Sequence, residues 1–385
     1  MRRFIIILAT IAAVFASVAP VATAGPINEV TLKAGKSRMK VGEWVKLSGR
    51  VQPAIEGQPV TIVDRDAGPI ADTTTDADGR YQVRYRPART LRVHAESLGA
   101  RSPAITIRVA FRVKVGMRKV ALFNKAKVTG VLEPAEPGES ILVRLVRFGK
   151  VVAKKRVKLF KGHSFKTRFH IGKPGNYRAK VRYDDKEHMG DSDSSRRRTT
   201  HLPSLSTGSR GPAVKRLERR LRSLGYYIPT VDRSYGTPTH DAIIAFNKIQ
   251  RRARIGSVDA NTWRALASPK RARPRAKSPR NHIEINQTRQ VVMFVRKGKV
   301  KWILHSSTGA GGATHDGVYR VHRKIAGYSG GRLYYPSYFD GLRAIHGWPE
   351  VPTYPASHGC ARIPMWAATW AHGKAPMGIQ VRVYH

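Results

Sequence analysis

Apolar and polar residues alternate over short runs between about residue 26 and residue 200, and Gly, Pro and Asp turn residues separate the runs. Clear examples are Tyr81-Gln82-Val83-Arg84-Tyr85 and the longer run from Tyr177 to Tyr183. A period of two places alternate side chains on opposite faces of a strand. The pattern therefore predicts antiparallel strands, each with one buried face and one polar face.

The same stretch contains an internal repeat. Lys46–Pro53 (KLSGRVQP) returns as Lys127–Pro134 (KVTGVLEP), and a second match keeps this offset, with Gly57–Val60 corresponding to Gly138–Ile141. A fixed period of this kind indicates two copies of one structural unit of about eighty residues.

We predict that each copy is a small all-β sandwich, the first over 25–110 and the second over 111–190. A polar segment that runs into Arg196-Arg197-Arg198 predicts a linker at 191–202. No constellation of catalytic residues stands out in either copy, which favours a role as spacers.

The pattern changes to a helical period in the next region, 203–268. Pro212 suits the first position of a helix, and Gly225 suits its end. Between them, Val214, Leu217, Leu221 and Leu224 fall on one stripe. A second helix is predicted to begin at 237–239 and a third to cover 262–266, which gives a small three-helix domain.

Residues 269–280 contain proline and many basic residues but no acid, which predicts an extended tether. Alternating runs return after it, at 282–286, 290–295, 299–306, 317–321 and 379–384. They predict a mostly β domain over 281–385 in which the stretch around residue 360 is the main irregular insertion.

The N-terminus predicts export. Met1-Arg2-Arg3, with its two basic residues, precedes an apolar run from Phe4 to about Val18, and the small residues Ala22-Thr23-Ala24 follow. This order is typical of a signal peptide, here 1–24, so we expect a secreted, extracytoplasmic protein that meets the membrane only during export. A retained membrane anchor is the alternative, although the run is shorter than a spanning helix requires.

Net charge narrows the choice of partner. The chain has 71 Lys and Arg against 25 Asp and Glu, a formal charge of +46. Such an excess favours polyanionic partners. Export argues against nucleic acid, and the basic tether lacks aromatic residues for base stacking. We therefore expect association with wall polyanions, and we assign no oligomeric state.

Cys360 is the single cysteine of the chain. It has no partner for an internal disulfide, and two histidines, His346 and His358, precede it closely in the sequence, which favours a reactive thiol. A thiol needs a nearby proton acceptor, a role that His346 suits. Gly359 would help to aim backbone N–H groups at an oxyanion, and Arg362 would meet a substrate carboxylate.

His346-Gly347 together with Ser357-His358-Gly359-Cys360-Ala361-Arg362 resembles the signature of the L,D-transpeptidases, whose catalytic domain is of the YkuD type. The segments 307–309 and 317–321 resemble the glycine-bearing strands of that family. The resemblance implies that Cys360 is the nucleophile, that His346 is its base and that His358 belongs to the catalytic site. Ser357, Gly359, Arg362 and Gly347 are implied to shape the substrate pocket and the oxyanion site.

The resemblance also implies the reaction. The thiol attacks the amide after the third residue of a peptidoglycan stem, D-alanine leaves, and the acyl group passes to a side-chain amine of a neighbouring stem, forming a 3-3 link. No metal or other cofactor is implied, whereas acylation of Cys360 by carbapenems is.

Two weaker resemblances lie upstream. Residues 203–268 resemble the small peptidoglycan-binding domain found beside many wall enzymes, with Glu218 and Asn247 standing where that family often has Gln. The two sandwiches resemble bacterial immunoglobulin-like modules without their cysteine pair. The peptidoglycan stem is thus the expected substrate, and the cell wall the expected location.

Two departures from the catalytic family's pattern affect the site. The segment between His346 and Ser357 is shorter than in many members, which leaves the acceptor open. Thr314-His315-Asp316-Gly317 replaces a common Thr-Pro-x-Gly pattern. We expect the second departure to alter only a turn.

Other functions are compatible with the same residues. Cys360 with His358, His346, His322 and His315 would suit a zinc site if three or more converged. Gly327–Gly331 matches a serine nucleophile elbow, with Asp340 and His346 in triad order, but it lacks the expected helix. An L,D-carboxypeptidase that uses water as acceptor and a non-catalytic wall-adhesion protein remain alternatives.

Overall fold

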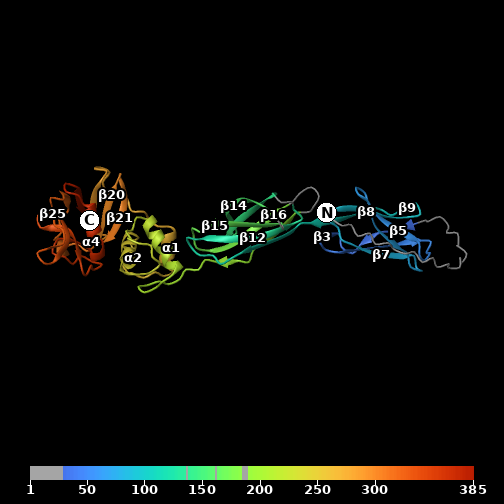
Figure 1. The fold of residues 1–385 in the computed structure, drawn as a ribbon, viewed down its shortest axis with the longest axis horizontal. Helices are drawn as coiled ribbons and strands as arrows, with labels where there is room; N and C mark the ends of the chain where they lie inside the picture. Colours follow the sequence, from blue (N-terminus) through green and yellow to red (C-terminus); the bar gives the residue numbers. More distant parts are fainter. Residues whose placement is uncertain (1–28, 136–137, 161–162, 184–189) are drawn as a thin grey trace, which may run out of the picture.

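The computed structural model describes residues 29–135, 138–160, 163–183 and 190–385, and four units follow one another along its long axis (Figure 1). Two β-sandwiches lead to a three-helix unit and a mostly β C-terminal unit, so the predicted fold class is confirmed. The predicted signal peptide, 1–24, lies outside the described residues. Within them, no helix is long and apolar enough to cross a membrane.

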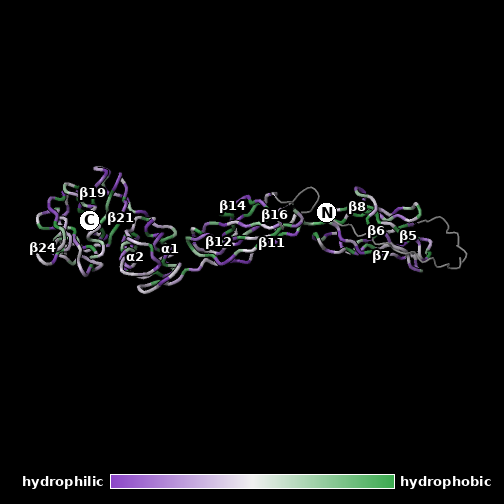
Figure 2. The backbone as a smooth tube through the Cα atoms, in the orientation of Figure 1, coloured by the Kyte–Doolittle hydropathy of each residue, from purple (hydrophilic) through white to green (hydrophobic). Residues whose placement is uncertain are grey.

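The first sandwich packs a four-stranded sheet against a six-stranded sheet, and its core is its own. Along its strands the tube in Figure 2 alternates between hydrophobic and hydrophilic residues, as the sequence pattern predicts. One sheet holds β1 (Glu29–Val30), β4 (Val45–Gln52), β2 (Lys33–Ala34) and β7 (Arg80–Tyr85). The other holds β3 (Arg38–Lys40), β10 (Ile105–Ala110), β8 (Leu91–Ser97), β5 (Pro59–Asp64), β6 (Gly68–Thr74) and β9 (Ala100–Arg101).

The second sandwich has a separate core built on Phe165 and Phe169. Its smaller sheet has the order β11 (Arg112–Met117), β12 (Lys125–Glu133), β15 (Ser164–His170). Its larger sheet contains β14 (Lys150–Lys158), β13 (Ser140–Arg147), β16 (Asn176–Tyr183), β17 (Asp191–Ser194) and β18 (Arg198–Thr199).

The linker predicted at 191–202 is wrong, because β17 and β18 both pair with β16. Ser195, between them, is buried, and its hydroxyl accepts a hydrogen bond from the N–H of Ala179 at 2.9 Å. The segment is polar and still lies in the sheet, because a serine hydroxyl there accepts a hydrogen bond from a backbone N–H group.

The repeated glycine of the two sandwiches has a packing reason. Gly49 pairs with Tyr81 and Gly130 with Phe165, so in each copy an aromatic ring from the partner strand lies across a glycine. A Cβ at Gly130 would come within 2.3 Å of the Phe165 ring, and one at Gly49 within 2.6 Å of the Tyr81 ring. The two copies thus share one cross-strand contact that no larger residue allows.

The helical unit consists of α1 (Pro212–Ser223), α2 (Thr237–Ile249) and α3 (Ala260–Ala267), close to the predicted segments. α1 buries Val214, Leu217 and Leu221, which is the predicted stripe. α2 is buried nearly all round, including Asp241 and Lys248, because it packs on α1 and also on a strand of the C-terminal unit.

The C-terminal unit contains two five-stranded sheets and one helix. The first sheet has the order β21 (Lys299–His305), β20 (Val291–Arg296), β19 (His282–Asn286), β28 (Gln380–Tyr384), β22 (Gly317–Arg320). The second contains β23 (Arg323–Lys324), β25 (Leu333–Asp340), β26 (Arg343–Trp348), β27 (Ala361–Pro364) and β24 (Tyr328–Ser329). Two helical segments complete it, η1 (Ala310–Gly312) and α4 (Met365–Lys374).

The helical and C-terminal units share one hydrophobic core. Val291, Met293 and Ile303 of the first sheet belong to the same cluster as the buried faces of α1 and α2. At the same interface, the Tyr227 ring stacks on Trp370 with centroids 3.8 Å apart. We therefore treat residues 203–385 as one body, called here the paired unit, and not as two separate domains.

The basic segment 269–280 is docked on this body. It contains no helix or strand, but the backbone N–H groups of Arg275 and Ala276 donate to the buried carboxylate of Glu284, both at 3.1 Å. The Arg275 guanidinium lies over the Tyr384 ring. The prediction of an extended tether is therefore wrong, because a buried carboxylate supplies acceptors for the backbone of a segment that charge repulsion alone would leave free.

Candidate active site

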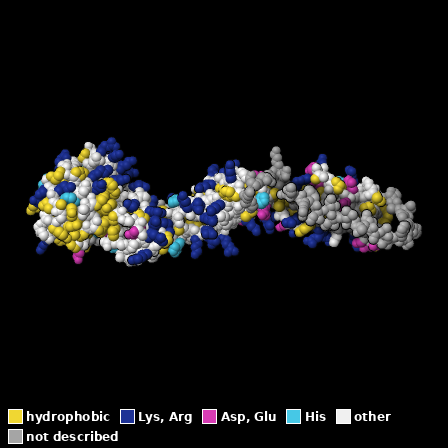
Figure 3. All heavy atoms as spheres, in the orientation of Figure 1, with side chains coloured by type: hydrophobic (Ala, Val, Ile, Leu, Met, Phe, Trp, Pro, Cys, Tyr) yellow, Lys and Arg dark blue, Asp and Glu magenta, His cyan; other side chains and the backbone are white. Residues whose placement is uncertain are grey.

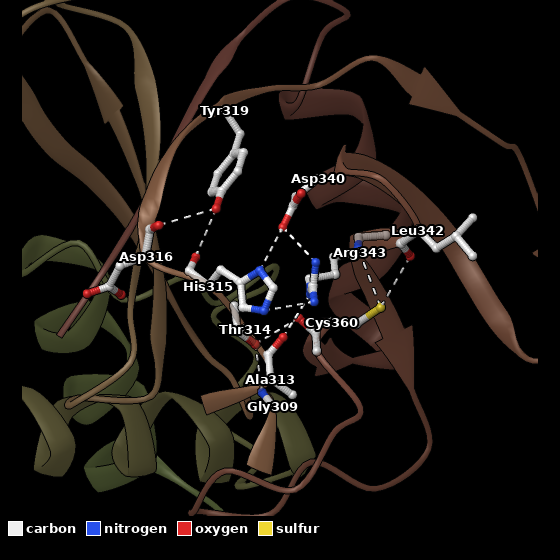
Figure 4. A network of polar contacts seen from close by, with 12 residues as sticks. Gly309, Ala313, Thr314, His315, Asp316, Tyr319, Asp340, Leu342, Arg343 and Cys360 are labelled. Carbon is white, nitrogen blue, oxygen red and sulfur yellow. Dashed lines mark hydrogen bonds and ion pairs between the residues drawn. The ribbon is translucent and has the colours of Figure 1, made fainter. Parts of the chain in front are cut away.

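Cys360 immediately precedes β27, which pairs with the parallel strand β26, and Figure 4 shows its sulfur beside Leu342. Its sulfur accepts a hydrogen bond from the N–H of Ala344 at 3.4 Å, and its thiol donates to the carbonyl of Leu342 at 3.8 Å. The residue is partly exposed. The thiol thus sits at the edge of a sheet, fixed by backbone and open to solvent.

The turn before Cys360 depends on Gly359 and Ser357. Gly359 has a φ of +130°, and a Cβ there would lie 2.8 Å from Nε of Arg343. The Ser357 hydroxyl accepts from the N–H of Gly359 and donates to the carbonyl of Cys360. Ser357 therefore shapes the turn, and the Gly359 N–H is already used. Within the described residues, the N–H groups of His358 and Cys360 have no protein acceptor.

His346 is buried on β26, two residues beyond the Ala344 that contacts the sulfur. Its Nδ1 lies 2.9 Å from the carbonyl of Gly347. Because a carbonyl only accepts, Nδ1 carries the proton and Nε2 keeps its lone pair. Burial lowers the pKa of His346 to about 4, so the ring is neutral at neutral pH. No hydrogen bond joins the His346 and Cys360 side chains in the described structure.

Opposing effects act on the thiol. Burial raises the pKa of Cys360 above its ordinary value, while the N–H of Ala344 and the charges of Arg362 and Arg343 offset part of this rise. The resting sulfur is therefore a thiol, and a neutral base is needed to remove its proton.

The remaining predicted site residues take different positions. Arg362 stacks on the Trp348 ring at 4.7 Å, and Trp348 contacts the edge of His346. His358, two residues before Cys360, is exposed. Gly347 allows α4 to approach β26, since a Cβ there would lie 2.6 Å from Cβ of Ala368. Gly347 thus contributes its carbonyl and a close contact between helix and strand.

A cationic network beside the thiol was missed from the sequence. Arg343 donates through Nε to the carbonyl of Ala313 at 2.8 Å and through an η nitrogen to Asp340 at 2.9 Å, and its other η nitrogen lies 3.1 Å from Nε2 of His315 (Figure 4). Thr314 donates to the carbonyl of Gly359 at 2.7 Å. The expectation that the departure at 314–317 alters only a turn is therefore wrong: His315 contacts Arg343, whose charge acts on Cys360. The unusual His315 was the available signal.

The segment 306–310 supports the nucleophile's turn from the other side. Ser307 exchanges both backbone hydrogen bonds with Arg362, and the carbonyl of Thr308 accepts from the N–H of Ser357 at 3.0 Å. The N–H of Ala310 donates to the carbonyl of Ser357 at 2.9 Å. Any shift of this segment moves the residues on both sides of Cys360.

A buried lysine from the helical unit holds that segment. Nζ of Lys248, on α2, lies 2.9 Å from the carbonyl of Gln290, 2.8 Å from that of Ser306 and 2.7 Å from Nδ1 of His305. His305 in turn donates from Nε2 to the carbonyl of Val351 at 2.8 Å.

These contacts fix the protonation of the pair. The three acceptors around Lys248 match the three N–H groups of an ammonium, and they oppose the burial that lowers the pKa of this lysine to about 6. Burial and the Lys248 charge lower the pKa of His305 to about 3, which keeps its ring neutral.

A second residue of the helical region reaches the loop before the nucleophile. Arg254 donates to the carbonyls of Thr353 and Thr288. Together with the contact between His305 and Val351, this ties the segment between His346 and Ser357 to the helical unit. The segment that the sequence analysis described as short is thus held in part by a residue outside the C-terminal unit, Arg254.

The rival sites are not assembled. Among the described residues, no group of three or more His, Cys, Asp or Glu lies close enough to hold a metal ion. Ser329, the candidate elbow serine, lies in β24 and its hydroxyl contacts Tyr338. β25 follows it in place of the helix that the elbow requires, so this alternative is wrong.

Comparisons with known proteins match two regions. The model of the L,D-transpeptidase (YkuD) catalytic domain matches residues 280–383, and a peptidoglycan-binding domain model matches residues 210–266. No curated protein matches the chain.

Two solved structures are similar to the chain. An L,D-transpeptidase fragment from Xylanimonas cellulosilytica is 34% identical and covers 48% of this chain and 97% of its own, with a TM-score of 0.44. A mutant L,D-transpeptidase from Enterococcus faecium is 22% identical, covering 27% of this chain and 49% of its own, with a TM-score of 0.25. Because the catalytic-domain model spans Cys360 and its turn, and the 34% identity extends over nearly the whole Xylanimonas fragment, the chain belongs to the L,D-transpeptidase family.

Proposed function

We propose that this chain is an exported cysteine acyltransferase that forms 3-3 crosslinks between peptidoglycan stems and releases D-alanine. The observation that carries the proposal is the fixed, partly exposed thiol of Cys360, hydrogen-bonded to the N–H of Ala344, with neutral His346 on the adjoining strand. A neutral imidazole with a free Nε2 is the base that a protonated thiol requires.

The first half-reaction forms an acyl-enzyme. Nε2 of His346 takes the thiol proton as the sulfur attacks the carbonyl after the third stem residue. The C–N bond then breaks and the proton passes from His346 to the departing amine. D-alanine leaves, and the acyl group stays on Cys360 as a thioester. Substrate binding must bring Nε2 into hydrogen-bond reach of the sulfur, directly or through one water.

Backbone donors near the sulfur suit the tetrahedral intermediate. The N–H groups of His358 and Cys360 have no acceptor among the described residues, whereas that of Gly359 is bonded to Ser357. We assign the first two as the oxyanion donors. Gly359 is proposed to act through the turn that aims these two N–H groups.

In the second half-reaction an amine of a neighbouring stem attacks the thioester. His346 accepts the amine proton, the C–S bond breaks, and the thiol is restored when this proton returns to sulfur. Arg362 and His358 are proposed to contact the stem, because the Arg362 charge acts on the thiol and His358 is exposed two residues before it. No cofactor is required by these steps.

Location in the cell wall follows from three features together: the predicted signal peptide, the peptidoglycan-binding domain match and the net charge of +46. Peptidoglycan stems carry carboxylates, so a cationic protein is attracted to the polymer that its catalytic unit acts on.

The test is product analysis with tetrapeptide-bearing muropeptides. We expect crosslinked dimers and free D-alanine, identified by mass spectrometry. Tripeptide monomers without dimers would assign the enzyme as an L,D-carboxypeptidase, and neither product with a reactive thiol would favour the non-catalytic adhesion protein. Cys360→Ala should abolish both products and the mass increase on carbapenem treatment, while His346→Gln should slow acylation by about 10²–10⁴.

A further inference from the structure

A cleft lies where the second sandwich meets the helical unit. It has a volume of about 470 Å³, and α1 supplies most of its wall. The lining residues from the sandwich are Phe123, Asn124 and His170, and those from the helical unit include Lys215, Arg216, Arg219, Arg220 and Arg233. The cleft is far along the chain from Cys360 and belongs to neither half-reaction.

The wall of this cleft carries positive charges that no lining carboxylate neutralises. It is lined by no Asp or Glu, and none of its four arginines or its lysine forms an ion pair with a carboxylate in the described structure. Positions 215, 219 and 216, 220 each lie one helical turn apart, so α1 presents adjacent rows of positive charge. Lys and Arg gather on the visible face of this middle part of the molecule in Figure 3.

Arg216 has a buried donor without a partner among the described residues, and this is energetically unfavourable. Nε of Arg216 is buried and has no hydrogen-bond partner, while one of its η nitrogens donates to the carbonyl of Pro212. Burial lowers the pKa of both Arg216 and Arg220. α1 has no acid in its first turn, so the positive end of its dipole adds to the same field. An unpaired buried donor among like charges is a feature expected of a site that awaits an anion.

We infer that this cleft binds a phosphodiester polymer that lacks stacked bases, a chemistry found in anionic wall polymers. The planar donors of arginine match phosphate oxygens in pairs. Two aromatic rings line the cleft, those of Phe123 and His170, and the larger one, Phe123, is covered by the Arg220 guanidinium at 4.9 Å, which closes this face to base stacking. The inference does not depend on the transpeptidase reaction, and it gives the junction between the units a binding role.

The test is binding of synthetic poly(glycerol phosphate) to the full chain by isothermal titration calorimetry at several salt concentrations. We expect saturable binding that weakens as salt rises, because condensed counterions are released. The double variant Arg216→Gln/Arg219→Gln should lose about tenfold in affinity. Arg216→Lys/Arg219→Lys should lose less, since it keeps the charge but not the paired donors.

A matched control removes the same charge elsewhere. Lys154→Gln/Lys158→Gln acts on β14, where both lysines are exposed. This variant should bind as the unmodified chain does; an equal loss would overturn the inference in favour of net charge. Tighter binding to duplex DNA, or to vesicles with phosphatidylglycerol, than to the polymer would also overturn it.

The inference also predicts a stability change of opposite sign to the affinity change. Arg216→Gln removes an unpaired buried donor and one repelling charge, so the ligand-free protein should unfold at a higher temperature while polymer affinity falls. A parallel fall of both would assign Arg216 a structural role and contradict the site. Unchanged carbapenem acylation of Cys360 in these variants would show that the catalytic unit is intact.

Discussion

The first sandwich and the helical unit are both modules upstream of the nucleophile, but they join their neighbours differently. The first sandwich has a core of its own. The helical unit shares its core with the strands of the C-terminal unit, and through Lys248 it holds the backbone beside the nucleophile's turn. The two modules therefore differ in structure. The first sandwich is a separate unit, whereas the helical unit is part of the same body as Cys360.

The helical unit matches a peptidoglycan-binding domain, but the match does not account for its packing on the C-terminal unit. Residues 210–266 match a peptidoglycan-binding model, yet α2 buries an aspartate and a lysine against the C-terminal unit. Asp241 accepts a hydrogen bond from the Trp366 indole at 2.8 Å. Burial of such groups is costly unless they are paired, so the partnership between the two units is specific.

The largest expected effect comes from Lys248→Met. This change leaves the acceptors at Gln290, Ser306 and His305 without their donor, which should destabilise the paired unit by about 2–4 kcal/mol. Acyl transfer should fall about tenfold even well below the unfolding temperature, because the segment beside Arg362 and Ser357 shifts.

Calorimetry and carbapenem acylation rates check this prediction. Lys154→Met on the exposed face of β14 is the control and should change neither quantity. Full activity in folded Lys248→Met would mean that the lysine only stabilises the fold and does not position the site.

Acid should affect the paired unit next most strongly. Burial lowers the pKa of His346 to about 4, whereas an unfolded histidine has a pKa of about 6.5. The folded state therefore binds fewer protons in this window, and its stability is complete above pH 6.5 and declines as pH falls toward 4. The loss should reach roughly 2 kcal/mol near pH 4.5 for this group alone.

Scanning calorimetry between pH 7 and 4.5 would follow this decline in the transition of the paired unit. His346→Gln should make the decline shallower, and the part that remains is expected from His305, whose pKa burial lowers to about 3. The acid limb of acylation should also lie near pH 4 in the wild type, and a limb near 6.5 would refute neutral, buried His346 as the base.

A smaller effect, confined to the second sandwich, is expected from Gly130→Ala. The new Cβ would meet the Phe165 ring and the carbonyl of Lys114, costing about 1–3 kcal/mol through strain. Because this sandwich has its own core, the calorimetric transition of the sandwich should move while the acylation rate of Cys360 stays the same. Gly138→Ala, where no atom lies within 4 Å of the new Cβ, is a control for the added methyl group, although its φ of +99° adds local strain.

The smallest effect is expected from removing residues 29–110. No core residue of the first sandwich belongs to the paired unit's cluster, so acyl transfer by the shortened protein should agree with that of the full chain within about twofold. A large loss of activity on soluble muropeptides would show that the first sandwich is more than a spacer.

Most of the fold follows from periodicity. The two β copies, the α1 stripe and the strands of the first C-terminal sheet appear in the predicted places because period and turn residues are local signals. The second C-terminal sheet, β23 to β27, was missed, and the stretch predicted as an irregular insertion around residue 360 contains β27. α4 was missed, since its sequence, MWAATWAHGK, has apolar residues on all sides and no stripe. The linker and the tether were misjudged because polar composition says nothing about buried partners such as Glu284.

The site was only partly accessible from sequence. Cys360 stands out as a lone thiol preceded by two histidines, and the structure places His346 on the adjoining strand. Arg343 and Lys248 gave no signal, because a basic residue in a very basic chain resembles a solvated one. Their roles depend on tertiary contacts that no spacing rule specifies.

The docked basic segment has a consequence for survival outside the cell. With Lys270, Arg271, Arg273, Arg275, Lys277 and Arg280, it offers trypsin-like proteases many cleavage sites. A protease must draw an extended stretch of backbone into its cleft, and here Glu284 holds the N–H groups of Arg275 and Ala276. Through this carboxylate, β19 thus protects the segment from a cleavage that would separate the helices from Cys360.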